Sequence, residues 1–171
     1  MVICGDCGQR KLSQEIIDTC CNSGGAVVFD GEKLFQSGDD PFFLVLCLNS
    51  LSDLNIRNCL IVLGKALIGM KNDIDLSGYV CILDGENRDS IDFACSSGMT
   101  SVGCSMNGHD TLTVSAFGED GKAVVALRRC ISFSGREIEP CEFSVPMKQT
   151  DNIYPFLAGC AVTLLSGTAG D

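Results

Sequence analysis

The sequence predicts an α/β protein with a three-layer core and a mainly parallel sheet. Up to residue 104, short apolar runs of strand length alternate with amphipathic segments of helical spacing. The 19 glycines of the 171-residue chain separate short elements, and no repeat period is visible. We therefore expect a single domain over residues 1–171, long enough to bury a hydrophobic core.

The first part of the chain contains short apolar runs that end at glycine or aspartate turns. They are expected strands, at residues 2–4, 26–29, 33–35 and 42–48. The run 42–48 is continuously apolar, which is typical of a strand buried on both faces. Residues 12–21 predict an amphipathic helix that stops at Gly24 and Gly25. The stretch 56–70 is ambiguous, but its apolar residues recur at helical spacing and favour a helix.

Two further strands are expected at residues 79–83 and 101–104, separated by a helix near 89–96. Beyond residue 110 the pattern changes to strand-like runs separated by Glu-Asp-Gly and Ser-Gly-Arg turns, at residues 111–117, 123–132 and 138–145. These runs predict an antiparallel hairpin extension at 111–145. Residues 151–166 predict a closing helix, with Asp151 as its N-cap and Gly167 as its stop.

The charge balance excludes several classes of partner. The formal net charge is −10 and the basic residues are scattered, so no basic stripe is present to bind nucleic acid. No segment approaches the roughly 18 consecutive apolar residues that cross a bilayer, so we expect no membrane contact. The N-terminus lacks the pattern of a secretory leader, and we expect a cytoplasmic location.

The chain contains 12 cysteines, most of them within apolar runs. Cys47, Cys81 and Cys160 are examples, and in such positions cysteine behaves as a small buried hydrophobe. We therefore expect thiols rather than disulfides. Cys4 and Cys7 have the spacing of a redox or half-metal motif, but no second pair with that spacing exists to complete a zinc site, so no metal ligands are assigned.

The N-terminal residues form the first candidate site. A short strand runs into a turn with two glycines and then into a helix, the arrangement in which backbone N–H groups cradle a phosphate. The candidate phosphate-binding residues are Gly5, Asp6, Cys7, Gly8, Gln9 and Arg10. Gln9 stands where a catalytic lysine is expected in such a loop. The alternative is a tight turn that uses glycine for its backbone freedom alone.

A second group of polar residues follows the expected strand 79–83. Asp84, Glu86, Asp89 and Asp92 form an acidic cluster after its carboxyl end, where α/β proteins bind ligands. They suit contact with a ribose or a metal ion. They suit equally a solvated helix N-terminus, whose dipole favours acidic residues. The single histidine, His109, lies in a turn and gives little support for a nucleophilic triad.

In their order along the chain, these features resemble the central ATP-binding domain of the Mur ligase family, which joins amino acids to cell-wall precursors. The loop 5–10 stands where that family has a Gly-Thr-Asn-Gly-Lys-Thr type of loop. Asn49 begins a segment similar to the family's Asn-Ile-Ser-Pro-Asp-His-Leu-Asp type of motif, without its histidine. Lys65 matches by position a lysine that is carbamylated in many members.

Two later segments extend the resemblance. Residues 82–87 are similar to the family's strand that ends in Asn-Ala-Asp-Asp and contacts the nucleotide, and residues 148–154 are similar to a helix start of the Gly-Arg-His-Asn-Val-Tyr-Asn type. The resemblance implies a Rossmann-like or P-loop-like sheet and ATP or ADP with magnesium as ligands. It also implies that Asn49, Asp84, Glu86 and Asn87 contact the nucleotide.

The departures from the family pattern predict lost chemistry. Gln9 removes the charge at the β- and γ-phosphates, and the segment before strand 42–48 is too short to supply the family's magnesium-binding glutamate. Lys65 is therefore interpreted as a surface or capping lysine. The hypothesis is a non-catalytic Mur-ligase-like domain that keeps weak nucleotide or partner binding. The alternatives are an ATP-dependent amide ligase component whose missing domains come from a protein partner, and a thiol- or metal-binding protein.

Overall fold

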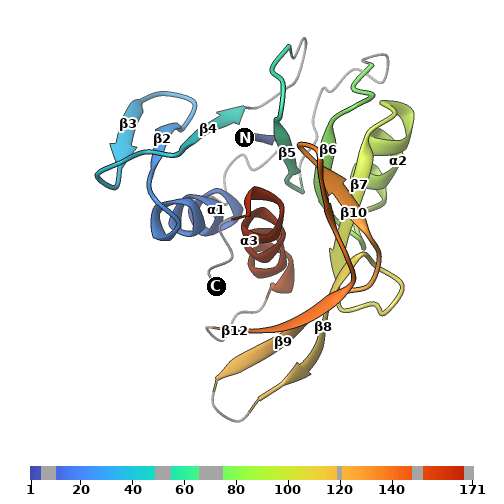
Figure 1. Cartoon of the computed structure of the whole chain (residues 1–171). Helices are drawn as coiled ribbons and strands as arrows, with labels where there is room; N and C mark the ends of the chain where they lie inside the picture. Colours follow the sequence, from blue (N-terminus) through green and yellow to red (C-terminus); the bar gives the residue numbers. More distant parts are fainter. Residues whose placement is uncertain (5–10, 49–54, 66–74, 119–120, 148–151, 168–171) are drawn as a thin grey trace.

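The computed structural model describes residues 1–4, 11–48, 55–65, 75–118, 121–147 and 152–167, and it contains a ten-stranded sheet (Figure 1). The strands of this sheet are β1 (Val2–Cys4), β2 (Ala26–Phe29), β3 (Leu34–Ser37), β4 (Phe43–Leu48), β5 (Leu60–Leu63), β6 (Val80–Asp84), β7 (Thr100–Ser105), β8 (Leu112–Phe117), β9 (Lys122–Leu127) and β12 (Cys141–Pro146). The remaining elements are the small β10 (Ile131–Phe133) and β11 (Arg136–Ile138) pair and the helices α1 (Lys11–Asn22), α2 (Arg88–Ser96) and α3 (Ile153–Ser166).

The strand order is β12-β9-β8-β7-β6-β5-β1-β4-β2-β3. Every neighbouring pair from β2 to β8 is parallel, and β3, β9 and β12 add antiparallel strands at the two ends. The predicted α/β class, with a mostly parallel sheet and an antiparallel hairpin extension, is therefore confirmed. The extension continues the main sheet through β8, which pairs with β7 over only two residue pairs.

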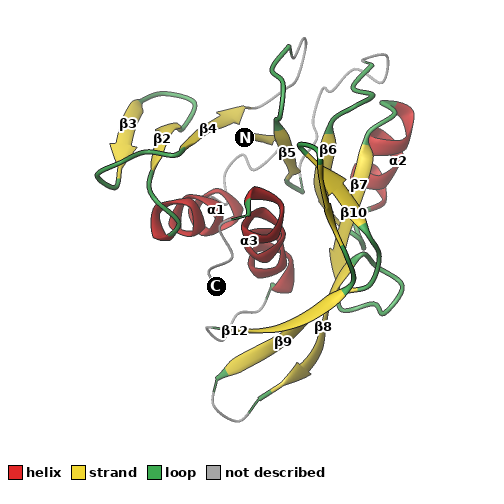
Figure 2. Cartoon of the chain, in the orientation of Figure 1, coloured by secondary structure: helices red, strands yellow, loops and turns green. Residues whose placement is uncertain are grey.

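Helices cover both faces of the sheet (Figure 2). Side chains of a strand alternate between faces, so Ile3 packs with α1 and α3, whereas Val2 and Cys4 pack with Phe93 of α2. This two-sided cover is what a parallel sheet needs in order to bury its strands. In the part of the chain that is described, no helix is long and apolar enough to cross a membrane.

The helix predicted for residues 56–70 is wrong in its described part. Leu60–Leu63 form the strand β5, which is buried along its whole length between β1 and β6. A short apolar run fits helical spacing and a buried strand equally well, and here the sheet decides between them. Residues 66–74 lie outside the described part.

The prediction that strand 42–48 is buried on both faces is also wrong. Of the β4 side chains only Val45 is buried, and Leu44 is 50% exposed. Helix α1 packs on β4 from one side, but α2 packs chiefly on β6 at a distance of several strands. A continuous apolar run therefore does not guarantee burial where the sheet is wider than the helices on it.

The hairpin extension contains more strands than the sequence predicts. The expected strand 123–132 divides into β9 and β10, and the expected strand 138–145 begins at β12 after the separate β11. A bend separates β9 from β10, and there the N–H of Arg128 bonds to the carbonyl of Thr111 at 2.8 Å. Ser134 and Gly135, both with positive φ, then turn the chain between β10 and β11.

Helix α3 is the most buried helix and packs against α1, β6, β7 and β8. Its N-cap is Asn152, whose Oδ1 accepts the N–H of Tyr154 at 3.2 Å, so the prediction of Asp151, which lies outside the described residues, is wrong. Its predicted stop is confirmed, because Gly167 adopts the left-handed conformation at φ 75°. At Gly159 the helices approach closely, since a Cβ there would lie 2.8 Å from Thr19 Oγ1.

Tyr154 fixes the first turn of α3 to the sheet. Its hydroxyl donates to the carbonyl oxygens of Leu63 at 2.6 Å and Ile82 at 3.2 Å, in the interior of the protein. These carbonyls belong to adjacent strands, so one side chain joins α3, β5 and β6.

Tyr154→Phe tests this link. We expect the free energy of unfolding to fall by about 1–2 kcal/mol, because a buried donor is removed and two carbonyls lose a partner. Urea denaturation measures the change. The matched control is Tyr79→Phe, at the other of the two tyrosines. The Tyr79 hydroxyl accepts a longer bond of 3.3 Å from the Ile56 N–H in an exposed position, so a smaller loss is expected. Equal losses would contradict the role of Tyr154.

Candidate functional site

The candidate site is the carboxyl edge of the parallel strands, between β1 and β5. These strands are adjacent and parallel, but the chain continues from them in opposite directions along the sheet. From β1 it passes through α1 to β2, beyond β4, whereas from β5 it passes to β6 on the other side. In open α/β sheets, ligands usually bind outside the strand ends at such a reversal.

Hydrogen bonds join the end of β5 to β1 and to the start of α2. The Gly64 N–H donates to the carbonyl of Cys4 at 2.6 Å, directly beyond β5 and β1. The Ser90 hydroxyl donates to the Gly64 carbonyl, and the Asn87 side-chain amide donates to the Lys65 carbonyl, each at 3.5 Å. The β5 end is therefore held between β1 and the N-terminus of α2.

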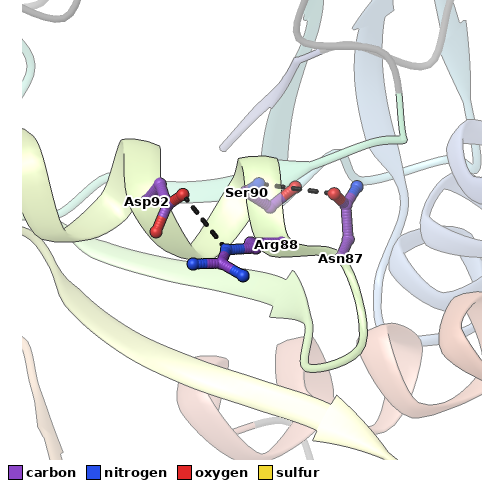
Figure 3. Close-up of polar contacts among 4 residues, drawn as sticks. All are labelled: Asn87, Arg88, Ser90 and Asp92. Carbon is purple, nitrogen blue, oxygen red and sulfur yellow. Dashed lines mark hydrogen bonds and ion pairs between the residues drawn. The ribbon is translucent and has the colours of Figure 1, made fainter.

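Asp84 is the last residue of β6, and Glu86 and Asn87 lie between β6 and α2. Asn87 is the N-cap of α2, and its Oδ1 accepts the Ser90 N–H at 3.4 Å (Figure 3). Oδ1 of Asp84 accepts the Glu86 N–H at 3.1 Å. Asn87 therefore caps α2, and Asp84 stabilises the turn that precedes it.

Arg88 and Asp92 form an ion pair on the outer face of α2, with 3.8 Å between Arg88 Nε and Asp92 Oδ2 (Figure 3). Their side chains are 92% and 73% exposed, so solvent screens the attraction. This pair is a surface feature of the helix and not part of the site.

Sequence reasoning missed Asp110, which also lies at this edge. Its Oδ2 accepts the hydroxyl of Ser105, at the end of β7. The carboxyl group lies against the backbone of Gly103, where a Cβ would be 2.8 Å from Oδ1, and even closer to Gly85. Glycine at these two positions therefore makes room for Asp110. The turn of residues 107–110 after β7 was the available signal for a site residue. The contact of Asp110 with Gly85 could not be predicted, because the two residues are 25 positions apart in the sequence.

The carboxylates of Asp84 and Asp110 both act on the buried Cys104 thiol of β7. Burial raises the pKa of Cys104 well above its ordinary value of 9.0, and the Cys160 thiol and then these two carboxylates raise it further. This edge of the sheet is therefore acidic, with an un-ionised thiol beneath it.

Gly85→Ala tests the packing of Asp110. We expect a loss of about 1–3 kcal/mol in the free energy of unfolding, because the added methyl group overlaps the carboxyl group. Asp110→Ala removes the obstacle, so the double variant should lose less than the sum of the two single losses. Denaturation of all four proteins gives the coupling energy. Additive losses would show that the two residues do not interact.

The loop 5–10 and Asn49 lie outside the described residues, so no contact is assigned to Gly5, Asp6, Cys7, Gly8, Gln9, Arg10 or Asn49. The strands that precede them are described. Cys4 ends β1, Leu48 ends β4, and the two residues are register partners in parallel strands. The predicted phosphate loop and Asn49 therefore follow neighbouring strands at the same edge of the sheet.

The buried cysteines agree with the sequence prediction except at Cys47. Cys81 and Cys160 are buried thiols, as expected, whereas Cys47 is half-buried. Burial raises the pKa of Cys20, Cys81 and Cys160 to about 12 from an ordinary value of 9.0. Within the described ranges, no three histidine, cysteine or acidic side chains gather closely enough to hold a metal ion.

These thiols predict alkaline sensitivity. Above pH 9 the unfolded chain releases their protons while the native state retains them, so stability is full below pH 9 and falls as pH rises towards 12. Each thiol should cost roughly 1 kcal/mol per pH unit in this window. Urea denaturation at pH 8 to 10 measures the slope. Cys81→Ala should reduce the slope, and the exposed Cys141→Ala should not. A slope that Cys81→Ala leaves unchanged would contradict this explanation.

No protein-family model matches the chain, and no curated sequence matches it significantly. The fold and the position of the site therefore carry the functional argument.

Proposed function

We propose that this chain is a nucleotide-binding domain, similar in plan to the central domain of Mur ligases, that does not carry out ligation. The observation that carries the proposal is the position of β1. Its carboxyl end lies at the reversal point of the sheet and leads directly into the glycine-containing loop and then into α1. Strand, loop and helix N-terminus at such a point form a favourable site for phosphate.

The strand order supports a ligand that spans several strand ends. β1, β5 and β6 are consecutive, and neighbouring strands lie roughly 4.8 Å apart, so the ends of β1 and β6 are about 10 Å apart. A nucleotide with its phosphates at the 5–10 loop would extend towards Asp84 and Asn87. The Oδ1 atom of Asp84 is already bonded to the Glu86 N–H, so a ribose hydroxyl or magnesium ion would be contacted through Oδ2.

The lack of ligation is inferred from two features of the chain. Gln9 is neutral, and phosphoryl transfer depends on fixed positive charge at the phosphates. Between α1 and β4 the chain forms only the β2–β3 hairpin, which leaves no room for the additional segment of the Mur ligases that binds magnesium. Magnesium, when bound, would supply charge neutralisation to the phosphates. Lys65 is exposed, which suits its interpretation as a surface lysine.

Gln9→Lys tests the proposed phosphate site. An ammonium group at the phosphates is worth roughly 1.5–3 kcal/mol, so we expect ATP to bind about ten- to a hundredfold more tightly than to the wild type. Adenosine, which has no phosphates, should gain little. Calorimetry with millimolar magnesium measures both, after a fluorescent ADP analogue has established saturable binding to the wild type.

The matched control is Gln14→Lys, the same change at an exposed position of α1. It should leave ATP affinity unchanged, which separates a local contact from a general effect of added charge. Equal ATP affinity of Gln9→Lys and the wild type would exclude the loop as a phosphate site. Steady ATP hydrolysis by the wild-type protein would contradict the non-catalytic proposal and favour the ligase alternative.

A further inference from the structure

The second surface with functional character is the outer edge of the sheet at β3. Two large apolar side chains of β3 are exposed, Leu34 (69%) and Phe35 (42%), and two more are exposed at or just before β4, beyond β2: Phe42 (70%) and Leu44 (50%). We call them the β3 patch. β3 is the last strand of the sheet and lies far from α2 (Figure 1). Clustered exposed apolar side chains mark interaction sites more often than isolated ones.

The β3 patch has members on both faces of the sheet. Leu34 pairs with Phe29 and Leu44 pairs with Val27, so Leu34 and Leu44 share one face of the sheet. Phe35 pairs with Val28 and therefore lies on the opposite face, which α1 covers further along. A strand placed beside β3 would have apolar contacts on both of its faces.

The backbone of β3 also presents unused pairing groups. The Asp30 N–H bonds to the Lys33 carbonyl, which sets the alternation of the β2–β3 ladder. Hydrogen-bonded pairs recur at every second residue, so the backbone groups of Phe35 and Ser37 bond to β2. The N–H and C=O groups of Leu34 and Gln36 therefore point away from the sheet. Within the described residues no strand pairs with this outer side.

The opposite edge of the same sheet is protected. β12 carries the charged Glu142 and ends in Pro146, and its apolar Phe143 and Val145 are half-buried. Charge and proline are the usual means by which proteins prevent pairing at a free edge. β3 contains neither a charged residue nor a proline. Of the two edges of the sheet, the β3 edge is therefore the one open to pairing with another strand.

The charges around the patch indicate the chemistry of its occupant. Asp30, Glu32, Asp39 and Asp40 flank β3, against a single basic residue, Lys33. A second copy of the chain would bring the same acidic rim against this one, and the whole chain carries a formal charge of −10. Like charges oppose such contact, whereas a basic segment is attracted.

We propose that β3 docks an extended basic segment of a partner protein, which adds a strand to the sheet. Main-chain bonds to Leu34 and Gln36 would provide pairing, and alternate apolar side chains would contact the β3 patch. Lysine or arginine residues of the segment would face the acidic rim. This surface lies at the end of the sheet and is separate from the proposed nucleotide site.

Two labelled peptides test the proposal by fluorescence anisotropy. One alternates valine with lysine and the other alternates valine with glutamate, over ten residues. We expect saturable binding of the lysine peptide, at least tenfold tighter than that of the glutamate peptide and weaker at high salt. No saturable binding of the lysine peptide at millimolar protein would overturn the proposal.

Variants at Leu34 separate strand addition from general attraction to an acidic protein. Leu34→Ala removes the side chain, and Leu34→Pro removes in addition an outward N–H at the first residue of the strand, where proline is tolerated. We expect Leu34→Pro to weaken binding at least tenfold and more than Leu34→Ala. The control Phe117→Lys, at a 59% exposed aromatic on β8, should leave binding within twofold.

Equal affinities for Leu34→Ala and Leu34→Pro would overturn strand addition. Circular dichroism of each variant confirms that it is folded before binding is compared. Sedimentation equilibrium of the wild-type protein tests the competing occupant. A dimer that Leu34→Pro converts to monomer would show that a second copy, and not a basic partner, occupies the edge.

Discussion

Much of the structure depends on how α3 covers the parallel sheet. A parallel sheet is stable only with both faces buried, and α3 covers β6, β7 and β8 on the face that it shares with α1. Its position is set by the Tyr154 hydroxyl at one end and by the close approach to α1 at Gly159. The helix comes last in the described chain but completes the core begun by the first strand. The core therefore forms through contacts that are distant in sequence, which slows folding relative to local structures.

The extent of helix cover also explains where the two proposed sites lie. In the centre of the sheet, helices on both faces leave the carboxyl ends of the strands as the accessible polar edge, and the candidate nucleotide site lies there. At β3 and β4 the helices no longer cover both faces, so apolar side chains remain exposed. The two surfaces thus follow from one geometric fact, which is that the sheet is wider than the helix layers.

The sequence predicted elements whose signals are local. Periodicity and turn residues predict the first strand, the first helix, the helix stop at Gly167 and the mainly parallel class. The sequence predicts a helix in place of β5 because the four apolar residues of this strand fit both patterns until a neighbouring strand is known. The sequence predicts too much burial for β4, because the residues of a strand do not show which part of a sheet the helices cover.

The candidate site was predictable to the same extent. The sequence proposes Asp84 and Asn87 because they follow the predicted strand 79–83, but their helix-capping and turn contacts required the structure. Asp110 was not found, because its significance depends on the bare backbone of Gly85 and Gly103 on neighbouring strands. Glycine in a sequence indicates freedom of the backbone, whereas here it indicates a space filled by a distant side chain.

The short pairing between β7 and β8 divides the sheet into a parallel part and the antiparallel hairpins. Only Cys104–Leu112 and Ser105–Thr113 pair across it, whereas β8–β9 and β9–β12 pair along nearly their whole lengths. Local opening follows the weakest boundary in a structure. The β8–β9–β12 hairpins are therefore joined to the parallel core by two residue pairs and by the burial of Leu112, Val114 and Val125 in the main hydrophobic core. In hydrogen-exchange terms, we expect the amides of these hairpins to share one opening event, distinct from global unfolding.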